Sequence, residues 1–181
     1  YENNVFIGNN LNPRGFISPI SDNALYYYRY KLLGTFFEDS NMISRIEVIP
    51  RRRYEPLFSG ILCIVDEDWR IHSLQLRLLK ESQMELVDTL QIEQLYRPHD
   101  RNNWFISSQV IYPSIKFLGI DAYGSFVNVY SDINTEPQFT KKSFNNTILK
   151  YSDSANKRNI EYWEKNRPLP LQEDEVRDYR K

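Results

Sequence analysis

The side chains that could carry out acid–base or metal chemistry are few in this sequence, and they are not grouped. The chain contains two histidines, His72 in an alternating apolar stretch and His99 in a polar turn. Neither has a second histidine or a cysteine pair nearby at the spacing of a zinc site. A site of His99, Asp100 and a distant third ligand is conceivable, but structural roles account for both histidines more simply. The sequence therefore predicts no metal centre and no cofactor.

The acidic residues and glycines also lack the spacing that catalysis or phosphate binding requires. Asp66-Glu67-Asp68 has neither the spaced oxygens nor the glycine of a calcium loop, which favours a solvated hairpin tip. No nucleophile elbow, phosphate loop or dinucleotide fingerprint occurs. Glu47 and Glu93 could serve as paired carboxylates, yet their alternation with apolar residues is typical of strand positions that face water. We therefore expect no catalytic residues, and an enzyme of unknown class is the last alternative.

One basic cluster stands out, Arg51-Arg52-Arg53, between two predicted strands. Charged residues at a strand end keep a sheet edge from pairing with another chain, and this is the simpler interpretation. The alternative is contact with anionic lipid headgroups or with an acidic neighbour. The sequence leaves both interpretations open.

Composition and charge exclude several classes of protein. A net charge of −1 argues against a nucleic-acid binder with a broad basic face. The single cysteine, Cys63, excludes an internal disulfide and is expected in the core. No apolar run approaches the roughly 18 residues of a membrane-spanning helix. Because the chain begins at Tyr1 rather than Met and ends at Lys181 within a charged helical pattern, we expect a segment of a longer protein.

The hydrophobic pattern predicts the elements that position these residues, and their centre is the stretch 58–80. Two apolar runs, Ile61–Val65 and Trp69–Leu79, flank the acidic turn, as is typical of a β-hairpin. The alternation of apolar and polar residues slips by one position near His72–Ser73. Such a slip would turn every later side chain to the opposite face, so we predict a β-bulge there.

Further strands are predicted on both sides of this hairpin, over residues 26–37, 42–49, 88–96 and 104–112. Pro113 is expected to end the last of these, and a bent strand or a hairpin around Gly124 follows over 115–130. The main alternative is a helix over 76–95, where leucines also fit the helical period. We predict a mainly β fold, a strongly curled antiparallel sheet or open half-barrel with short helices in the N-terminal lead-in and the C-terminal tail.

The pattern divides the chain into three regions. Residues 1–25 form a loop-rich lead-in, 26–131 an antiparallel β domain, and 132–181 a polar surface segment with a helical tail that contains prolines. In the tail, a short helix is expected over 160–165 and a second one after Glu173, with acidic residues first and basic residues last.

The tail also carries the residues of a resemblance to a known family. They are Tyr162-Trp163-Glu164, Asn166-Arg167-Pro168-Leu169-Pro170-Leu171, Glu173, Glu175 and Tyr179. Earlier stretches agree with it, namely Arg14-Gly15-Phe16, Ser18-Pro19-Ile20, 46–50, 58–60 and Asp68-Trp69. Together they resemble uncharacterised Bacteroidetes outer-membrane proteins that have a carboxypeptidase-regulatory-like N-terminal domain, a middle region of unknown function and a surface-antigen-type C-terminal barrel. Gln172 departs from the pattern, because a Thr that caps the last helix is expected there.

The resemblance implies that this chain is the middle, periplasmic part of such a protein. The full-length chain would attach it to the outer membrane, and its own barrel and N-terminal domain would be its partners. No peptidase activity is implied, because the regulatory-like domain is an accessory sandwich outside this chain. In that setting, Ser154 is a glycosylation candidate, because Asp153-Ser154-Ala155 matches the short pattern that Bacteroidetes use for periplasmic O-glycosylation.

The strands from Ile46 to Tyr112 are also similar, more loosely, to the curled sheets of periplasmic lipoprotein carriers. Two functions therefore compete: a non-catalytic module with a structural or interaction role, and a carrier or sensor that holds a lipid or other apolar ligand on a concave sheet face. An interaction module should expose an apolar patch, whereas a carrier should contain an apolar pocket. No nucleic-acid partner is expected.

Overall fold

The computed structural model describes residues 5–6, 11–12, 15–84, 87–100, 103–117, 119–140, 143–144, 153–154, 157–167, 170–171 and 173–178. The chain divides into two units, Tyr1–Ile133 and Asn134–Lys181. The first unit contains the sheet and the core, and the second contains two short helices. Arg14, Pro168, Leu169, Gln172 and Tyr179, on which part of the family resemblance depends, lie outside the described residues.

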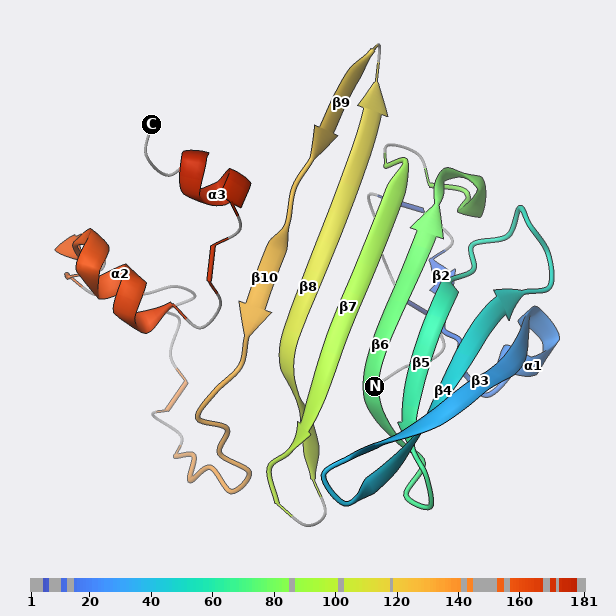
Figure 1. Ribbon diagram of the computed structural model, residues 1–181, viewed down its shortest axis with the longest axis horizontal. Helices are drawn as coiled ribbons and strands as arrows, with labels where there is room; N and C mark the ends of the chain where they lie inside the picture. Colours follow the sequence, from blue (N-terminus) through green and yellow to red (C-terminus); the bar gives the residue numbers. More distant parts are fainter. Residues whose placement is uncertain are drawn as a thin grey trace. The chain divides into compact units, whose positions relative to one another are not determined.

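The first unit is built on an eight-stranded sheet in which every neighbouring pair of strands is antiparallel (Figure 1). Its strands are β3 (Tyr28–Glu38), β4 (Asn41–Pro50), β5 (Ser59–Val65), β6 (Arg70–Leu79), β7 (Thr89–Pro98), β8 (Trp104–Phe117), β9 (Ile120–Tyr123) and β10 (Phe126–Val129). The strand order is β10-β8-β7-β6-β5-β4-β3, with β9 also paired to β8. The prediction of a mainly β, antiparallel fold is confirmed. A strongly curled sheet or half-barrel stays a prediction, because β3 and β10 do not pair among the described residues.

The central hairpin and its bulge form where predicted, except that Trp69, expected to begin the second strand, lies in the turn. β5 and β6 pair around the turn at residues 66–69, and Cys63 lies opposite Ser73 while Ile64 lies opposite Ile71. His72 is therefore the extra residue of a β-bulge. The helical alternative for 76–95 is wrong: β6 continues to Leu79, a 3-10 turn (η1, Lys80–Ser82) follows, and β7 starts at Thr89.

The predicted end of β8 at Pro113 is also wrong, because the strand passes through this proline and continues to Phe117. Pro113 pairs with Leu90 on one side, and its carbonyl accepts a hydrogen bond from the Gly124 N–H at 3.3 Å on the other. The gap between β9 and β10 lies opposite Pro113, so its missing N–H falls where the ladder is interrupted. The chain turns back at Gly119, whose φ of +82° suits glycine, and not around Gly124.

The core lies on one face of the sheet, where strand side chains pack against the lead-in and the segment after β6. The lead-in forms the two-stranded pair β1 (Val5–Phe6) and β2 (Phe16–Ile17) and the short helix α1 (Ala24–Tyr27), and Figure 1 shows β2 behind β5 and β6. The buried cluster that forms this core consists of Phe16, Ala24, Tyr28, Val48, Leu57, Phe58, Leu62, Leu76, Leu78, Met84, Val87 and Leu90. Residues 15–28 are therefore an integral part of the folded unit.

Tyr28 joins three parts of this core through one hydroxyl group. The side chain is fully buried. Its hydroxyl donates a hydrogen bond to the Ile17 carbonyl at 2.5 Å and accepts one from the Phe58 N–H at 3.0 Å. Burial raises the pKa of Tyr28 above its usual range, so the hydroxyl stays protonated. The lead-in and the start of β5 are thus tied to the first residue of β3.

In the second unit, helices form where the tail pattern predicted them. They are α2 (Ile160–Asn166) and α3 (Glu173–Asp178). The Asn159 side chain caps α2 by accepting a hydrogen bond from the Tyr162 N–H at 2.9 Å. Among the described residues, no helix has the length and apolar character needed to cross a membrane.

Removal of the Tyr28 hydroxyl tests its role in the core. We expect Tyr28→Phe to lower the free energy of unfolding by about 1–3 kcal/mol, because the buried Phe58 N–H and the partly buried Ile17 carbonyl lose this hydrogen-bond partner. Urea denaturation measures this difference. Tyr26→Phe is the matched control, because the Tyr26 side chain is 82% exposed. Equal stability of the two variants would contradict the assignment.

Candidate functional site

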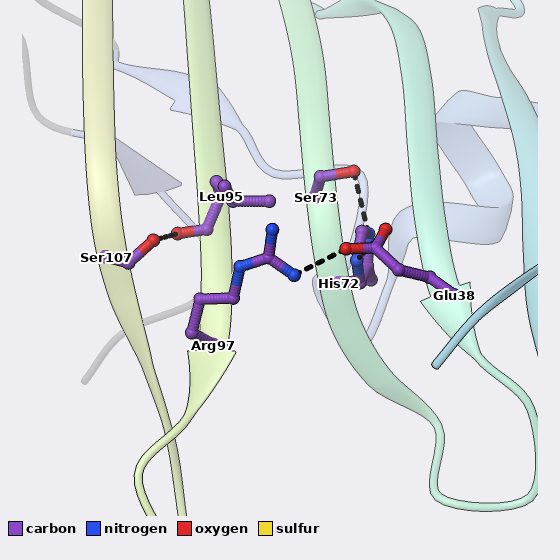
Figure 2. Close-up of polar contacts among 6 residues, drawn as sticks. All are labelled: Glu38, His72, Ser73, Leu95, Arg97 and Ser107. Atoms are coloured by element: carbon purple, nitrogen blue, oxygen red, sulfur yellow. Dashed lines mark hydrogen bonds and ion pairs between the residues drawn. The ribbon is translucent and has the colours of Figure 1, made fainter. Parts of the chain in front are cut away.

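The first candidate site is a polar cluster where β6 and β7 separate. Pairing between these strands stops at Ser73 and Leu95. Beyond that point, the Glu38 carboxylate at the end of β3 contacts Arg97 on β7 and His72 on β6 (Figure 2). The Arg97 Nη1 to Glu38 Oε1 distance is 2.5 Å, and the His72 Nε2 to Glu38 Oε2 distance is 3.1 Å. We call these three residues the sheet-end clamp.

The clamp brings together strands that the sheet order keeps apart. Neighbouring strands lie about 4.8 Å from each other, so β3 and β7, four places apart, would be about 19 Å apart in a flat sheet. The end of the β3–β4 hairpin therefore folds over β5 and β6, and in Figure 1 its tip lies beside the lower end of β7. The hydrogen bond and charge of Arg97 lower the pKa of Glu38, with a smaller contribution from His72.

His72 is held too tightly in this cluster to serve as a solvent-facing base. The side chain is buried, with the rings of Phe36 and Trp104 centred 6.2 and 6.4 Å from the imidazole. Its Nδ1 lies 3.2 Å from the Ser73 hydroxyl. Its Nε2 is within ion-pair distance of Glu38 but outside normal hydrogen-bond geometry.

The order hydroxyl, imidazole, carboxylate is that of a serine hydrolase. Here, however, the hydroxyl and the imidazole are neighbours in one strand, and Arg97 already neutralises the carboxylate. A neutralised carboxylate stabilises an imidazolium poorly. The arrangement therefore suits a fixed structural contact.

The three arginines that sequence analysis singled out make hydrogen bonds or ion pairs with other residues of the chain. The Arg51 Nε donates to the carbonyls of Leu25 and Tyr28 at 3.1 and 3.0 Å. Arg52 pairs with Glu55 at 2.7 Å, and Arg53 binds both oxygens of Glu81. The Arg52 and Arg53 side chains remain 74% and 69% exposed. Contact with an anionic surface would therefore compete with these internal ion pairs.

The remaining residues predicted from sequence are dispersed. His99 packs against Phe105 with ring centres 5.8 Å apart. In the described part of the chain, no group of three His, Cys, Asp or Glu residues could hold a metal ion. Ser154 lies in a turn, half-buried, and its hydroxyl is 3.5 Å from the Arg158 Nη2.

An exposed apolar surface on the β3–β4 hairpin was not predicted. We call it the hairpin surface, and it consists of Leu32, Leu33, Phe36, Phe37 and Met42. Leu32 is 61% and Phe37 is 74% exposed. The aromatic pattern of β3 indicated a strand, but exposure depends on its place at the edge of the sheet, which the pattern does not give.

A polar groove crosses the middle of the sheet on the face opposite the core. Two hollows of about 330 and 350 Å³ share Ile61 and Gln75 as lining residues. Polar lining residues along them include Arg45, Glu47, Ser73, Gln75, Arg77, Gln91, Glu93 and Ser108. Sequence reasoning treated Glu47 and Glu93 as solvated strand residues and missed the groove, because only the strand order places them on one surface.

The pH dependence of stability tests the sheet-end clamp. Because the folded state lowers the pKa of Glu38 from its ordinary value of 4.5, its stabilising contribution is present above that pH. The contribution disappears as the pH falls through the folded-state value. We expect Glu38→Gln to cost roughly 0.5–1 kcal/mol at neutral pH, because the carboxylate is partly exposed, and progressively less in acid.

Urea denaturation at several pH values measures this difference. Glu47→Gln is the matched control, because Glu47 is also a strand carboxylate but makes no ion pair within the described residues. A difference between wild type and Glu38→Gln that stays constant from neutral to strongly acid pH would rule out the proposed role of the carboxylate.

Comparisons with known proteins identify one family for this chain and no individual relative. Neither the curated proteins nor the solved structures contain a match to it. A family model described as a family of unknown function, DUF5686, matches residues 1–133. This match covers the lead-in and the entire sheet. The chain therefore belongs to the DUF5686 family.

Proposed function

We propose that the chain is a non-catalytic interaction module in the periplasmic part of an outer-membrane β-barrel protein. The observation that supports this function best is the hairpin surface, on which five large apolar side chains are exposed along one edge of the sheet. Large apolar side chains exposed on one hairpin, such as Leu32 and Phe37 here, mark interaction sites in soluble domains. The resemblance of the tail to outer-membrane proteins supports the periplasmic setting.

The backbone of β3 supports the same function. β3 runs for 11 residues and pairs only with β4 among the described strands. An edge strand presents unpaired N–H and C=O groups that can add a strand from a partner. The partner we propose is another part of the same full-length protein, its membrane barrel or its N-terminal domain.

The alternative function is a carrier that holds an apolar ligand in a curled half-barrel. The sheet-end clamp supports curvature, because it draws the end of β3 towards β7. The groove is poorly suited to a hydrocarbon chain, however, because Arg45, Glu47 and Glu93 would lose water without gaining a polar partner. The interaction module is therefore the preferred function.

Site-specific photocrosslinking in the full-length protein tests this function. With a benzoylphenylalanine at position 37 in place of Phe37, we expect crosslinks to regions of the same full-length polypeptide outside these 181 residues. Peptide mass spectrometry identifies the crosslinked segments. The matched control replaces Tyr26, an aromatic residue that is exposed on α1 and outside the hairpin surface. Equal crosslinking from both positions, or none from position 37, would contradict the proposal.

A further inference from the structure

The polar groove has the features of a binding surface that the sheet holds in place. Its lining residues come from β4, β5, β6, β7 and β8, and strand pairing places them in rows across the sheet. One such row joins Glu47, Ile61, Gln75 and Glu93, which are successive Cα partners. The groove also borders the sheet-end clamp, because Ser73 lines it and contacts His72.

The groove contains equal numbers of positively and negatively charged side chains. It contains two arginines, Arg45 and Arg77, and two glutamates, Glu47 and Glu93, so its formal charge is zero. Arg45 and Glu47 make no hydrogen bond or ion pair within the described residues, although both line the groove. A balanced surface of this kind gives no net attraction to a polyanion or a polycation.

Part of the groove is already oriented by hydrogen bonds. The side-chain amides of Gln75 and Gln91 both donate to the same Glu93 oxygen, at 3.2 and 2.6 Å. This arrangement leaves the two amide oxygens and the second Glu93 oxygen as acceptors, while the Arg45 guanidinium supplies donors. Donors and acceptors held side by side match hydroxyl groups, because each hydroxyl both donates and accepts.

The floor between these polar groups is apolar. Ile61, Cys63, Leu95 and Val110 line the same hollow as Arg45, Gln75 and Glu93. A ligand that combines hydroxyl groups with C–H surfaces satisfies both parts of the lining. A fatty acyl chain would satisfy only the floor and would desolvate the charged groups.

We propose that the polar groove binds a neutral oligosaccharide. The sugar hydroxyls contact Arg45, Gln75 and Glu93, and the C–H faces of the rings lie over Ile61 and Val110. This site uses residues on the sheet face and is separate from the hairpin surface, so either proposal can fail without the other.

Nuclear magnetic resonance titrations of the isotopically labelled chain test the proposal. The neutral probes are maltoheptaose, cellohexaose and chitohexaose, each added to about 10 mM because single-face sites bind weakly. We expect at least one of them to shift the backbone amides of Cys63, Gln75 and Glu93 and the side-chain amides of Gln75 and Gln91. Palmitate and inositol hexakisphosphate are the apolar and anionic comparison ligands.

Matched substitutions locate the binding site. Gln75 is exposed on β6, so Gln75→Ala removes one amide that lines both hollows while the fold is retained. We expect it to weaken oligosaccharide binding by about five- to tenfold, the effect of losing one or two hydrogen bonds. Arg45→Ala is a second variant with the same expectation. Gln138→Ala, at an exposed position in the second unit, should leave affinity unchanged.

Three results would overturn the proposal. The first is the absence of groove shifts with all three oligosaccharides. The second is a set of groove shifts that appears only with palmitate or only with inositol hexakisphosphate. The third is oligosaccharide binding that Gln75→Ala and Arg45→Ala leave as strong as Gln138→Ala does.

Discussion

The fold depends on one extra residue in its central hairpin. Side chains alternate between the two faces of a strand, so a continuous ladder would have carried the apolar residues of β6 onto different faces before and after Ser73. The bulge at His72 absorbs this slip. Leu74, Leu76 and Leu78 can then all face the core while the strand remains paired along its length.

The same bulge creates the sheet-end clamp. It places the imidazole of His72 where β6 and β7 separate, between two aromatic rings and beside the Glu38 carboxylate. A buried imidazole needs a polar neighbour, and the carboxylate in turn is held by Arg97. The bulge that keeps the leucines of β6 on the core face thereby also helps to fix the position of the β3–β4 hairpin at the edge of the sheet.

The two faces and the edge of the sheet have different chemical characters. One face is covered by the lead-in, whose Phe16 and Tyr28 are fully buried. The other face carries a groove with balanced charges over an apolar floor. The edge carries exposed apolar side chains on β3, which pairs only with β4 among the described strands. The two proposed sites, at the edge and in the groove, thus call for partners of different chemistry.

The sequence by itself determined the local structure: the strands, the central hairpin, the bulge near His72 and the tail helices. These follow from side-chain periodicity, which requires only neighbouring residues. It misjudged Pro113, because a proline is tolerated within a strand when the ladder is interrupted opposite it, and that depends on a distant strand segment. Only the tertiary structure decided which residues meet. The contact between Glu38 and Arg97 spans four places in the strand order, and the groove joins residues from five strands. Strand order and curvature are properties of the whole sheet, so no stretch of sequence specifies them alone.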